Sequence, residues 1–203
     1  YDRLASRYTK ALARSMANTK QVKAAAVLNN AFTPAFAGGD GVELCSTVHP
    51  TMAGTFSNEL TTPSDLNETS LEQALIDIAA FTDERGLKIA ARGMKMIIPS
   101  ELQFTADRLM KSEGQTGTAN NDINAIKNMG MIPQGYVVNH YLTAAKKWFI
   151  KTDVPNGLKH FVRSPIKTTM EGDFDTGNVR YKARERYVFG FSDPRGVFGS
   201  NAV

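Results

Sequence analysis

The hydrophobic and polar positions follow a helical period at the start of the chain. One side of the helix predicted over residues 3–16 is apolar or small, at Leu4, Tyr8, Ala11, Leu12 and Ser15. Good helix formers continue to Phe32, with Asn18 marking where the helix could bend, before Pro34 and the Gly38–Gly41 run end it. Unbroken to Phe32, the helix would be about 45 Å long at about 1.5 Å per residue, which is long for a chain of 203 residues.

The middle of the chain predicts two further helices around one strand. The capping box Thr69-Ser70-Leu71-Glu72 predicts the start of a helix, and Gly86 suits its left-handed cap. Met94–Ile98 predicts a short central strand. A second capping box, Ser100-Glu101-Leu102-Gln103, predicts a helix that ends at about Lys111.

The second half of the chain has the alternation that is typical of strands. After an exposed loop predicted at 112–121, short strands are predicted at Tyr136–Leu142, Lys147–Lys151, His160–Arg163 and Ile166–Met170. The clearest strand is Val179–Phe191, in which apolar and basic residues alternate, and it could extend about 40 Å at about 3.3 Å per residue. A long helix and a long strand beside a compact α+β middle predict an elongated subunit.

Composition narrows the class of protein. Of the 203 residues, 42% are hydrophobic and 22% are charged, which excludes a disordered tail and a coiled coil. No apolar run approaches the roughly 18 residues of a membrane span, and the first 30 residues lack the apolar centre expected of a signal peptide. The single cysteine, Cys45, cannot form an internal disulfide, so the fold does not depend on an oxidising compartment.

The positive charge is concentrated at the N-terminus. The chain has 24 Lys and Arg residues against 20 Asp and Glu residues, a net charge of +4, whereas residues 1–39 alone have a net charge of +5. Four bases form a stripe on the predicted helix without acids to relieve their repulsion: Arg3, Arg7, Lys10 and Arg14. The stripe is either a solvated face or a surface that faces DNA.

A second basic surface is predicted on the long strand. Its solvent-facing side is formed by Arg180, Lys182, Arg184 and Arg186. These side chains could contact nucleic acid or the acidic groups of a neighbouring chain. Because the face belongs to a long strand, contact with protein is favoured, and the four residues are predicted to lie in a subunit interface.

Cys45 and His49 could supply two metal ligands or a Cys–His nucleophile pair. A closed structural zinc site needs four ligands, and only His140 and His160 remain as further nitrogen ligands. The residues around Cys45 show no oxyanion-hole motif. The favoured interpretation is a buried thiol and a loop histidine, with no metal and no catalytic residue assigned.

Two other motifs suggest phosphate chemistry but fit it poorly. Gly38–Gly41 lacks the Lys-Ser/Thr of a phosphate-binding loop and follows a helix, so it predicts a chain reversal. Asp173 and Asp175 match the Asp-x-Asp-x-Thr pattern of aspartyl phosphotransferases, but no apolar strand leads into Asp173. The pair is predicted to lie in a polar turn before the long strand. The chain is therefore predicted to be neither an enzyme nor a cofactor-binding protein.

Several stretches of the chain have a characteristic order and local sequence. They are Ala24–Phe32, Met96–Leu102, Tyr136–Leu142 followed by Lys147–Ile150, and the stretch from Phe174 to Gly196. Together they resemble tailed-bacteriophage major capsid proteins over most of the chain. The resemblance implies the α+β Hong Kong 97-type capsid fold, with a long spine helix, long peripheral-domain strands and a compact axial domain.

The resemblance also implies a domain plan. Residues 1–61 would hold part of the peripheral domain with the spine helix at about 1–33, and residues 62–178 would form the axial domain. Residues 179–203 would hold the long strand that returns to the peripheral domain. The family's N-terminal arm and extended loop would lie upstream of Tyr1, outside this sequence, so no covalent cross-link is assigned.

The function that the resemblance implies is that of a structural major capsid protein. It would self-assemble through pentamers and hexamers, in the host cytoplasm, into the icosahedral shell of a virion. Its partners would be copies of itself, packaged double-stranded DNA bound non-specifically, and scaffold, portal or decoration proteins, with no membrane. The family's spine helix lies on the inner side of the shell, which would make Arg3, Arg7, Lys10 and Arg14 DNA-facing.

Three alternatives stay open. The first is a non-catalytic nucleic-acid-binding domain that uses the basic N-terminal helix. The second is an encapsulin-like cargo shell, which shares the capsid fold. The third is a phosphotransferase that uses Asp173 and Asp175.

Overall fold

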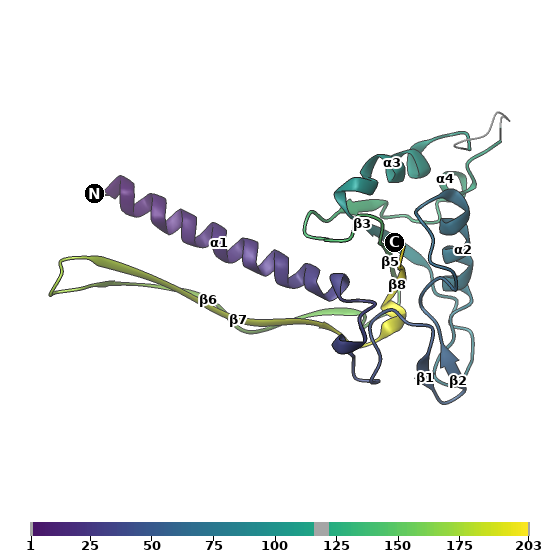
Figure 1. Ribbon diagram of the computed structural model, residues 1–203, viewed down its shortest axis with the longest axis horizontal. Coiled ribbons are helices and arrows are strands. Elements are labelled where there is room, and N and C mark those ends of the chain that lie inside the picture. Colours follow the sequence, from purple (N-terminus) through teal and green to yellow (C-terminus); the bar gives the residue numbers. More distant parts are fainter. Residues whose placement is uncertain (1, 116–121, 203) are drawn as a thin grey trace.

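The computed structural model describes residues 2–115 and 122–202, and it has two parts of different shape (Figure 1). The helix α1 (Asp2–Asn29) and the strands β6 (Leu158–Gly172) and β7 (Val179–Phe191) project together from one side, and we call them the arm. The remaining elements form the compact part. α1 runs for 28 residues without a break at Asn18, so the predicted long helix is confirmed.

The compact part is built from short elements. In chain order they are η1 (Pro34–Phe36), β1 (His49–Thr51), β2 (Gly54–Phe56), α2 (Glu68–Ala79), β3 (Gly93–Ile98), η2 (Ser100–Leu102), α3 (Gln103–Lys111), α4 (Ala125–Met129), β4 (Tyr136–Val138), β5 (Trp148–Thr152), η3 (Pro194–Gly196) and β8 (Val197–Ser200). Its main sheet has the order β4-β3-β5-β8, in which β3 runs parallel to β4 and antiparallel to β5. The predicted central strand at Met94–Ile98 is therefore confirmed as β3.

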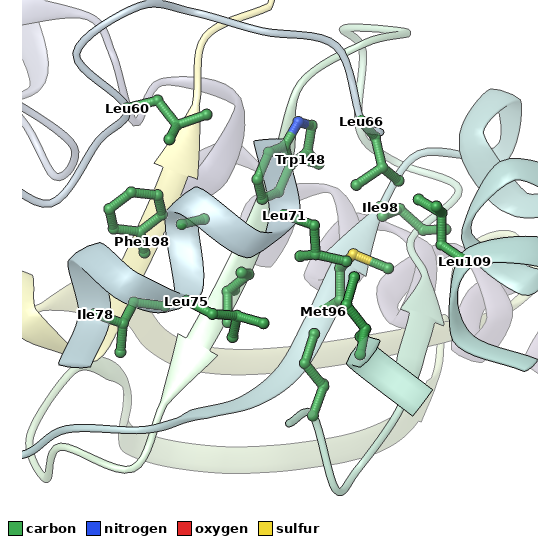
Figure 2. Close-up of a cluster of buried hydrophobic side chains, with 14 of the residues drawn as sticks. Leu60, Leu66, Leu71, Leu75, Ile78, Met96, Ile98, Leu109, Trp148 and Phe198 are labelled. Carbon is green, nitrogen blue, oxygen red and sulfur yellow. The ribbon is translucent and has the colours of Figure 1, made fainter. Parts of the chain in front are cut away.

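Helix α2 covers the sheet with its apolar side (Figure 2). Leu71, Leu75 and Ile78 follow the helical spacing and are buried. They belong to one cluster with residues from three strands of the sheet and from α3, including Met96, Ile98, Leu109, Trp148 and Phe198. This core belongs to the compact part, and it includes no residue of the arm.

The arm is attached to the compact part at two places. At the end of α1, Leu28 is buried in a second apolar cluster together with Phe149 of β5 and Val197 of β8. At the base of the hairpin, Gly157 lies so close to Gly196 that a Cβ on either glycine would collide with the backbone of the other. Together these contacts fix the direction in which the arm leaves.

The start of α2 differs from the predicted capping box at Thr69–Glu72, which is wrong by two residues. Asn67 is the N-cap, because its Oδ1 accepts from the Ser70 backbone N–H at 2.8 Å, and its own N–H donates to Ser70 Oγ at 3.0 Å. Asparagine is among the best N-cap residues, and serine can take the return role that glutamate usually plays. The helix ends at Ala79, so Gly86, at φ +82°, serves a later turn rather than the helix cap.

The second predicted capping box, at Ser100–Gln103, does not form. Pro99 precedes a 3₁₀ turn at Ser100–Leu102, and α3 then begins at Gln103 without a side-chain cap. The end of this helix at Lys111 is confirmed. In the exposed loop predicted at 112–121, residues 116–121 lie outside the described residues.

The arm's two strands form one antiparallel hairpin, with a register that runs from Leu158 opposite Phe191 to Gly172 opposite Val179. The predicted strand Val179–Phe191 is confirmed as β7. The two short strands predicted at His160–Arg163 and Ile166–Met170 are one continuous strand, β6. The register shifts on both sides of Ser164, next to Pro165, whose missing N–H cannot join the ladder.

The pairing of these elements crosses the divisions predicted at residues 61/62 and 178/179, and the domain plan itself stays a prediction. Residue 178 lies in the turn between β6 and β7, so a boundary there separates two paired strands. Phe56 and Leu60, before the first division, belong to the core that α2 covers. β8 pairs with β5 in the compact part instead of prolonging the long strand. In the described ranges, no helix is both long and apolar enough to cross a membrane.

Candidate functional site

The two parts of the molecule have opposite net charges. Residues 1–29 and 158–191, which form the arm, contain 13 bases and five acids, for a net charge of +8. All other residues together contain 11 bases and 15 acids, for a net charge of −4. The two basic surfaces predicted from the sequence, on α1 and on β7, belong to one arm, because β6 and β7 join α1 only in the folded chain.

The predicted stripe on α1 lines a surface groove of about 880 Å³, which we call the basic groove. Its walls include the exposed side chains of Arg7, Lys10 and Arg14. Tyr141, from the loop after β4, also lines the groove. Asn29 fixes that loop, since its Nδ2 donates to the Tyr141 carbonyl and its Oδ1 accepts from the Thr143 N–H, both at 3.0 Å.

The bases of this groove are available to an external anion. Arg7, Lys10 and Arg14 form no ion pair within the described chain. Three positive side chains on one helix face repel one another, and a polyanion would relieve that repulsion. Arg3 lies one turn before Arg7 on the same helix, but its side chain is outside the description.

The apolar side predicted for the start of α1 finds no core within the chain. Tyr8 is 65% exposed, Ala11 and Ser15 are exposed as well, and Leu12 is only half-buried. Ala25 is the first residue of α1 that is described as buried. The N-terminal part of the helix extends beyond the compact part (Figure 1).

The long strand has one face toward α1 and one face away from it. Lys20 of α1 pairs with Glu185 at 3.6 Å and lies 5.1 Å from the centre of the Tyr187 ring. Because side chains alternate along a strand, Arg184 and Arg186 point to the opposite side. With their cross-strand neighbours they form what we call the outer face of the hairpin: Lys159, Phe161, Ser164, Lys167, Thr169, Glu171, Arg180, Lys182, Arg184, Arg186 and Val188.

The acidic pair considered for phosphate chemistry lies in the hairpin turn, as predicted. Asp173 accepts from Arg180 at 2.6 Å and from the Asp175 backbone N–H at 3.3 Å. The turn is closed by backbone bonds between Asp173 and the residues at 177 and 178. Asp173 therefore fixes the turn and one base of the outer face.

His49 lies in a buried hydrogen-bonded cluster and not beside a nucleophile. Its Nδ1 is hydrogen-bonded to Asp40 Oδ2 at 2.6 Å, and its Nε2 lies 3.1 Å from Asn58 Oδ1. The orientation of the Asn58 amide is fixed, because its Nδ2 donates to the carbonyls of Leu44, Pro194 and Val197 at 2.7–3.0 Å. Both ring nitrogens of His49 are thus held by side chains of the cluster. The cluster ties the loop at 38–58 to the C-terminal strand.

The remaining candidate ligands do not gather around His49. Burial, followed by the charges of Glu59 and Glu43, raises the pKa of the Cys45 thiol well above its usual range, so it stays protonated and unreactive. His160 is in β6, stacked on Phe189 with ring centres 4.4 Å apart. Across residues 2–115 and 122–202, no three His, Cys, Asp or Glu side chains are grouped to hold a metal. Gly38–Gly41 forms the predicted chain reversal and presents Asp40 to His49.

A family model described as phage capsid protein matches residues 1–200 of this chain. The chain belongs to the phage capsid protein family. A search of curated proteins finds no match. The family assignment agrees with the resemblance drawn from the sequence.

Two solved structures with TM-scores above 0.5 share the fold of this capsid family member at low sequence identity, and a third is similar at a lower TM-score. A protein of Mycobacterium phage Che8 is 16% identical with a TM-score of 0.52, covering 96% of this chain and 62% of that one. A phage-related protein from Bordetella bronchiseptica RB50 is 13% identical with a TM-score of 0.51, covering 97% and 64%. The capsid of an empty GTA particle is 16% identical with a TM-score of 0.49, covering 98% and 65%. This chain therefore spans about three-fifths of the length of the structures that it matches.

Sequence reasoning missed part of each surface of the capsid chain. Asn18 and Gln21 line the basic groove and continue the spacing of Arg14, so helical periodicity could have found them. Tyr141 could not be found that way, because only the tertiary fold brings its loop to α1. Asn58 likewise shows its role only once the C-terminal strand is in place.

Proposed function

We propose that this chain is the subunit of a phage major capsid and assembles into a closed icosahedral shell. The observation that carries the proposal is the arm, which is built for contacts that a single chain does not make. Its hairpin is a two-stranded ribbon with two free edges, and such ribbons are marginally stable alone. The exposed side chains of Tyr8, Ala11 and Ser15 on α1 add a second surface for contact with another molecule. Because the chain belongs to the phage capsid protein family, we infer that neighbouring subunits of a capsid shell cover the hairpin and the exposed part of α1.

The elements fit the Hong Kong 97-type plan. In the proposed assignment α1 is the spine helix, the hairpin of β6 and β7 supplies the long strands of the peripheral domain, and the compact part is the axial domain. Pentamers and hexamers of one chain place the same surfaces at slightly different angles. Long, polar and extended contacts tolerate such differences better than one tightly packed apolar interface.

The proposed site of DNA contact is the basic groove on α1. With α1 on the inner side of the shell, Arg3, Arg7, Lys10 and Arg14 would face packaged double-stranded DNA and neutralise phosphates. Contact would be non-specific, since phosphate contacts contain no sequence information. The protein would thus reside in the virion after assembly in the host cytoplasm, where scaffold, portal or decoration proteins could join it.

Electron microscopy of the purified protein, including any residues upstream of Tyr1 in its gene, tests the proposal. Negative-stain images are expected to show closed shells or rings of five and six subunits. A monomer that persists at high protein concentration would contradict it. Shells that contain protein cargo and no DNA would favour the encapsulin-like alternative.

One observation favours a second candidate, a nucleic-acid-binding domain. The net charge of +8 on the arm would attract a duplex even without a shell. This candidate predicts a monomer or dimer that binds short duplexes with an affinity that falls steeply with salt. Gel-filtration size and a salt titration of binding on the same sample separate the two functions.

A further inference from the structure

The outer face of the hairpin combines positive charge with exposed apolar surface. Arg184 and Arg186 form no ion pair within residues 2–115 and 122–202. Beside them, Phe161 and Val188 are paired across the strands and are 55% and 59% exposed. A phosphate backbone would neutralise the bases but would leave the two apolar side chains in water. A protein surface with acids and an apolar residue would satisfy both.

Helix α2 has that complementary pattern on a side where Glu68 and Glu72 are half-buried and Ile76 is exposed. Glu68, Glu72 and Ile76 follow one another at intervals of four residues, and the helix contains no base. Ile76 is 62% exposed, although its neighbours Leu75 and Ile78 are buried. In the part of the chain that the structure describes, neither glutamate forms an ion pair.

The two patterns also have matching spacing. Four residues along a helix rise about 6 Å, and two residues along a strand rise about 6.6 Å. The spacing of Glu68, Glu72 and Ile76 along α2 is therefore nearly the same as the spacing of their proposed partners on β7. These partners are Arg184, Arg186 and Val188. The accumulated difference over two steps is about 1 Å, which flexible arginine side chains absorb.

The two surfaces of one chain cannot meet each other. α2 lies on the side of the compact part that faces away from the arm, and the hairpin extends in the opposite direction (Figure 1). The occupant of each surface must be another molecule. A second copy of this chain provides the required charge, apolar side chain and spacing.

We propose that the outer face of the hairpin of one subunit docks on α2 of the next subunit, with Arg184 at Glu68, Arg186 at Glu72, and Val188 with Phe161 against Ile76. The contact joins two different surfaces, so it is head-to-tail and generates rings when the rotation closes. It deepens the proposed function, on which it rests, by naming which surfaces meet.

Charge reversal tests the pairing. Arg184→Glu with Arg186→Glu, and separately Glu68→Lys with Glu72→Lys, are each expected to lower shell yield at least tenfold, because like charges then face each other. All four substitutions in one chain restore the attraction and are expected to recover most of the wild-type yield. Circular dichroism melting of each unassembled variant checks that it folds.

The matched control changes the same net charge on a different surface. Arg7→Glu with Arg14→Glu alters two bases of the basic groove, and combining this pair with the α2 reversal is expected to give no rescue. Rescue by the control pair would mean that net charge alone governs assembly, and it would overturn the proposed contact.

A disulfide test reports the contact whether or not shells form. Glu72→Cys with Arg186→Cys in one chain is expected to give a ladder of linked subunits under mild oxidation, while either cysteine alone gives none. The native Cys45 is buried and does not interfere. Phe104→Cys with Arg186→Cys is the matched control, because Phe104 is exposed on α3 and outside the proposed contact.

The outcomes separate this contact from the proposed function. Shells without a ladder and without rescue would overturn the contact and leave the capsid function intact. A ladder without shells would support the contact and count against the function. Reversal at Arg184 and Arg186 that leaves shell yield unchanged but removes packaged DNA would assign the outer face to DNA and overturn the contact. Absence of shells, ladder and rescue together would refute both.

Discussion

The arm and the compact part of this chain are stabilised by different means. The compact part has an internal core, in which Leu71 and Trp148 are completely buried. The arm has few buried side chains, a net charge of +8 and a hairpin with free edges. The difference teaches that stability and assembly are divided between two regions of one chain. Substitutions in the core of the compact part act on the stability of the folded subunit, whereas substitutions in the arm act on contacts with other molecules.

Loss of Trp148 is expected to have the largest effect on the isolated subunit. Trp148→Ala empties a core position and removes the hydrogen bond from its Nε1 to the Ser64 carbonyl, so it lowers the free energy of unfolding by about 3–5 kcal/mol. Far-UV circular dichroism in urea measures it. The matched substitution in the arm, Tyr8→Ala, is expected to cost less than about 0.5 kcal/mol. Equal losses of unfolding free energy in the Trp148→Ala and Tyr8→Ala variants would contradict the idea that the compact part, and not the arm, stabilises the subunit.

Asn58→Ala is expected to rank second. It leaves the carbonyls of Leu44, Pro194 and Val197 without their shared donor and His49 without an acceptor, at a cost of about 3 kcal/mol in unfolding free energy. Asn178→Ala, in the exposed hairpin turn, is the control and is expected to cost less than about 0.5 kcal/mol. Thermal melting of the two variants side by side gives the comparison.

A smaller, pH-dependent effect is expected at Glu59. Burial, and then the charge of Glu43, raise the pKa of the Glu59 carboxyl above its usual value, while His49 opposes the shift. A raised folded-state pKa favours folding at pH values below the ordinary carboxyl range, and that contribution is lost as the pH rises through the folded pKa. Glu59→Gln is therefore expected to stabilise the subunit at pH 7 by less than about 1 kcal/mol, since the side chain is half-buried and screened.

The same comparison made near pH 3 is the control for Glu59, because both side chains are then neutral. The two proteins are expected to melt together there. A stabilisation that persists unchanged at acid pH would mean that packing, and not charge, causes it. Glu43→Gln, which removes only the repulsion, is expected to give a smaller stabilisation than Glu59→Gln at pH 7.

The smallest effect on the subunit is expected for the basic groove. Replacing Arg7, Lys10 and Arg14 together with Gln keeps helix propensity nearly constant and changes unfolding free energy by less than about 0.5 kcal/mol. Empty shells are expected to assemble, while filled particles lose DNA on heating, and the difference from wild type shrinks at high salt. A triple variant that folds but forms no shells would instead make the groove a subunit interface.

Local sequence patterns predicted the elements whose stability is local in origin. The helical period fixed α1, and strict alternation fixed both ends of β7. β6 was read as two pieces because its bulges around Pro165 interrupt the alternation, and only pairing with β7 makes it one strand. The start of α2 was misplaced because the Ser70 hydroxyl, and not a glutamate, returns the capping bond to Asn67.

For the basic groove and the outer face of the hairpin, the sequence predicted only those residues that lie together on one helix or one strand. Arg7, Lys10 and Arg14 share a helix face, and Arg184 and Arg186 share a strand face, so their grouping follows from spacing alone. The position of Tyr141 at the groove depends on how distant segments are placed in space. No periodicity within the sequence specifies that placement.

The contact between Gly157 and Gly196 at the base of the hairpin sets the position of the far end of the arm. The backbones of Gly157 and Gly196 are in contact at the point where β6 leaves the compact part. With a strand of 13 residues beyond it, each degree of tilt at this point moves the tip by about 0.7 Å. A methyl group added at either glycine would force such a tilt. In the proposed capsid shell, this tilt of the arm would change the angle between neighbouring subunits, and so the curvature of the shell, far from the substituted residue.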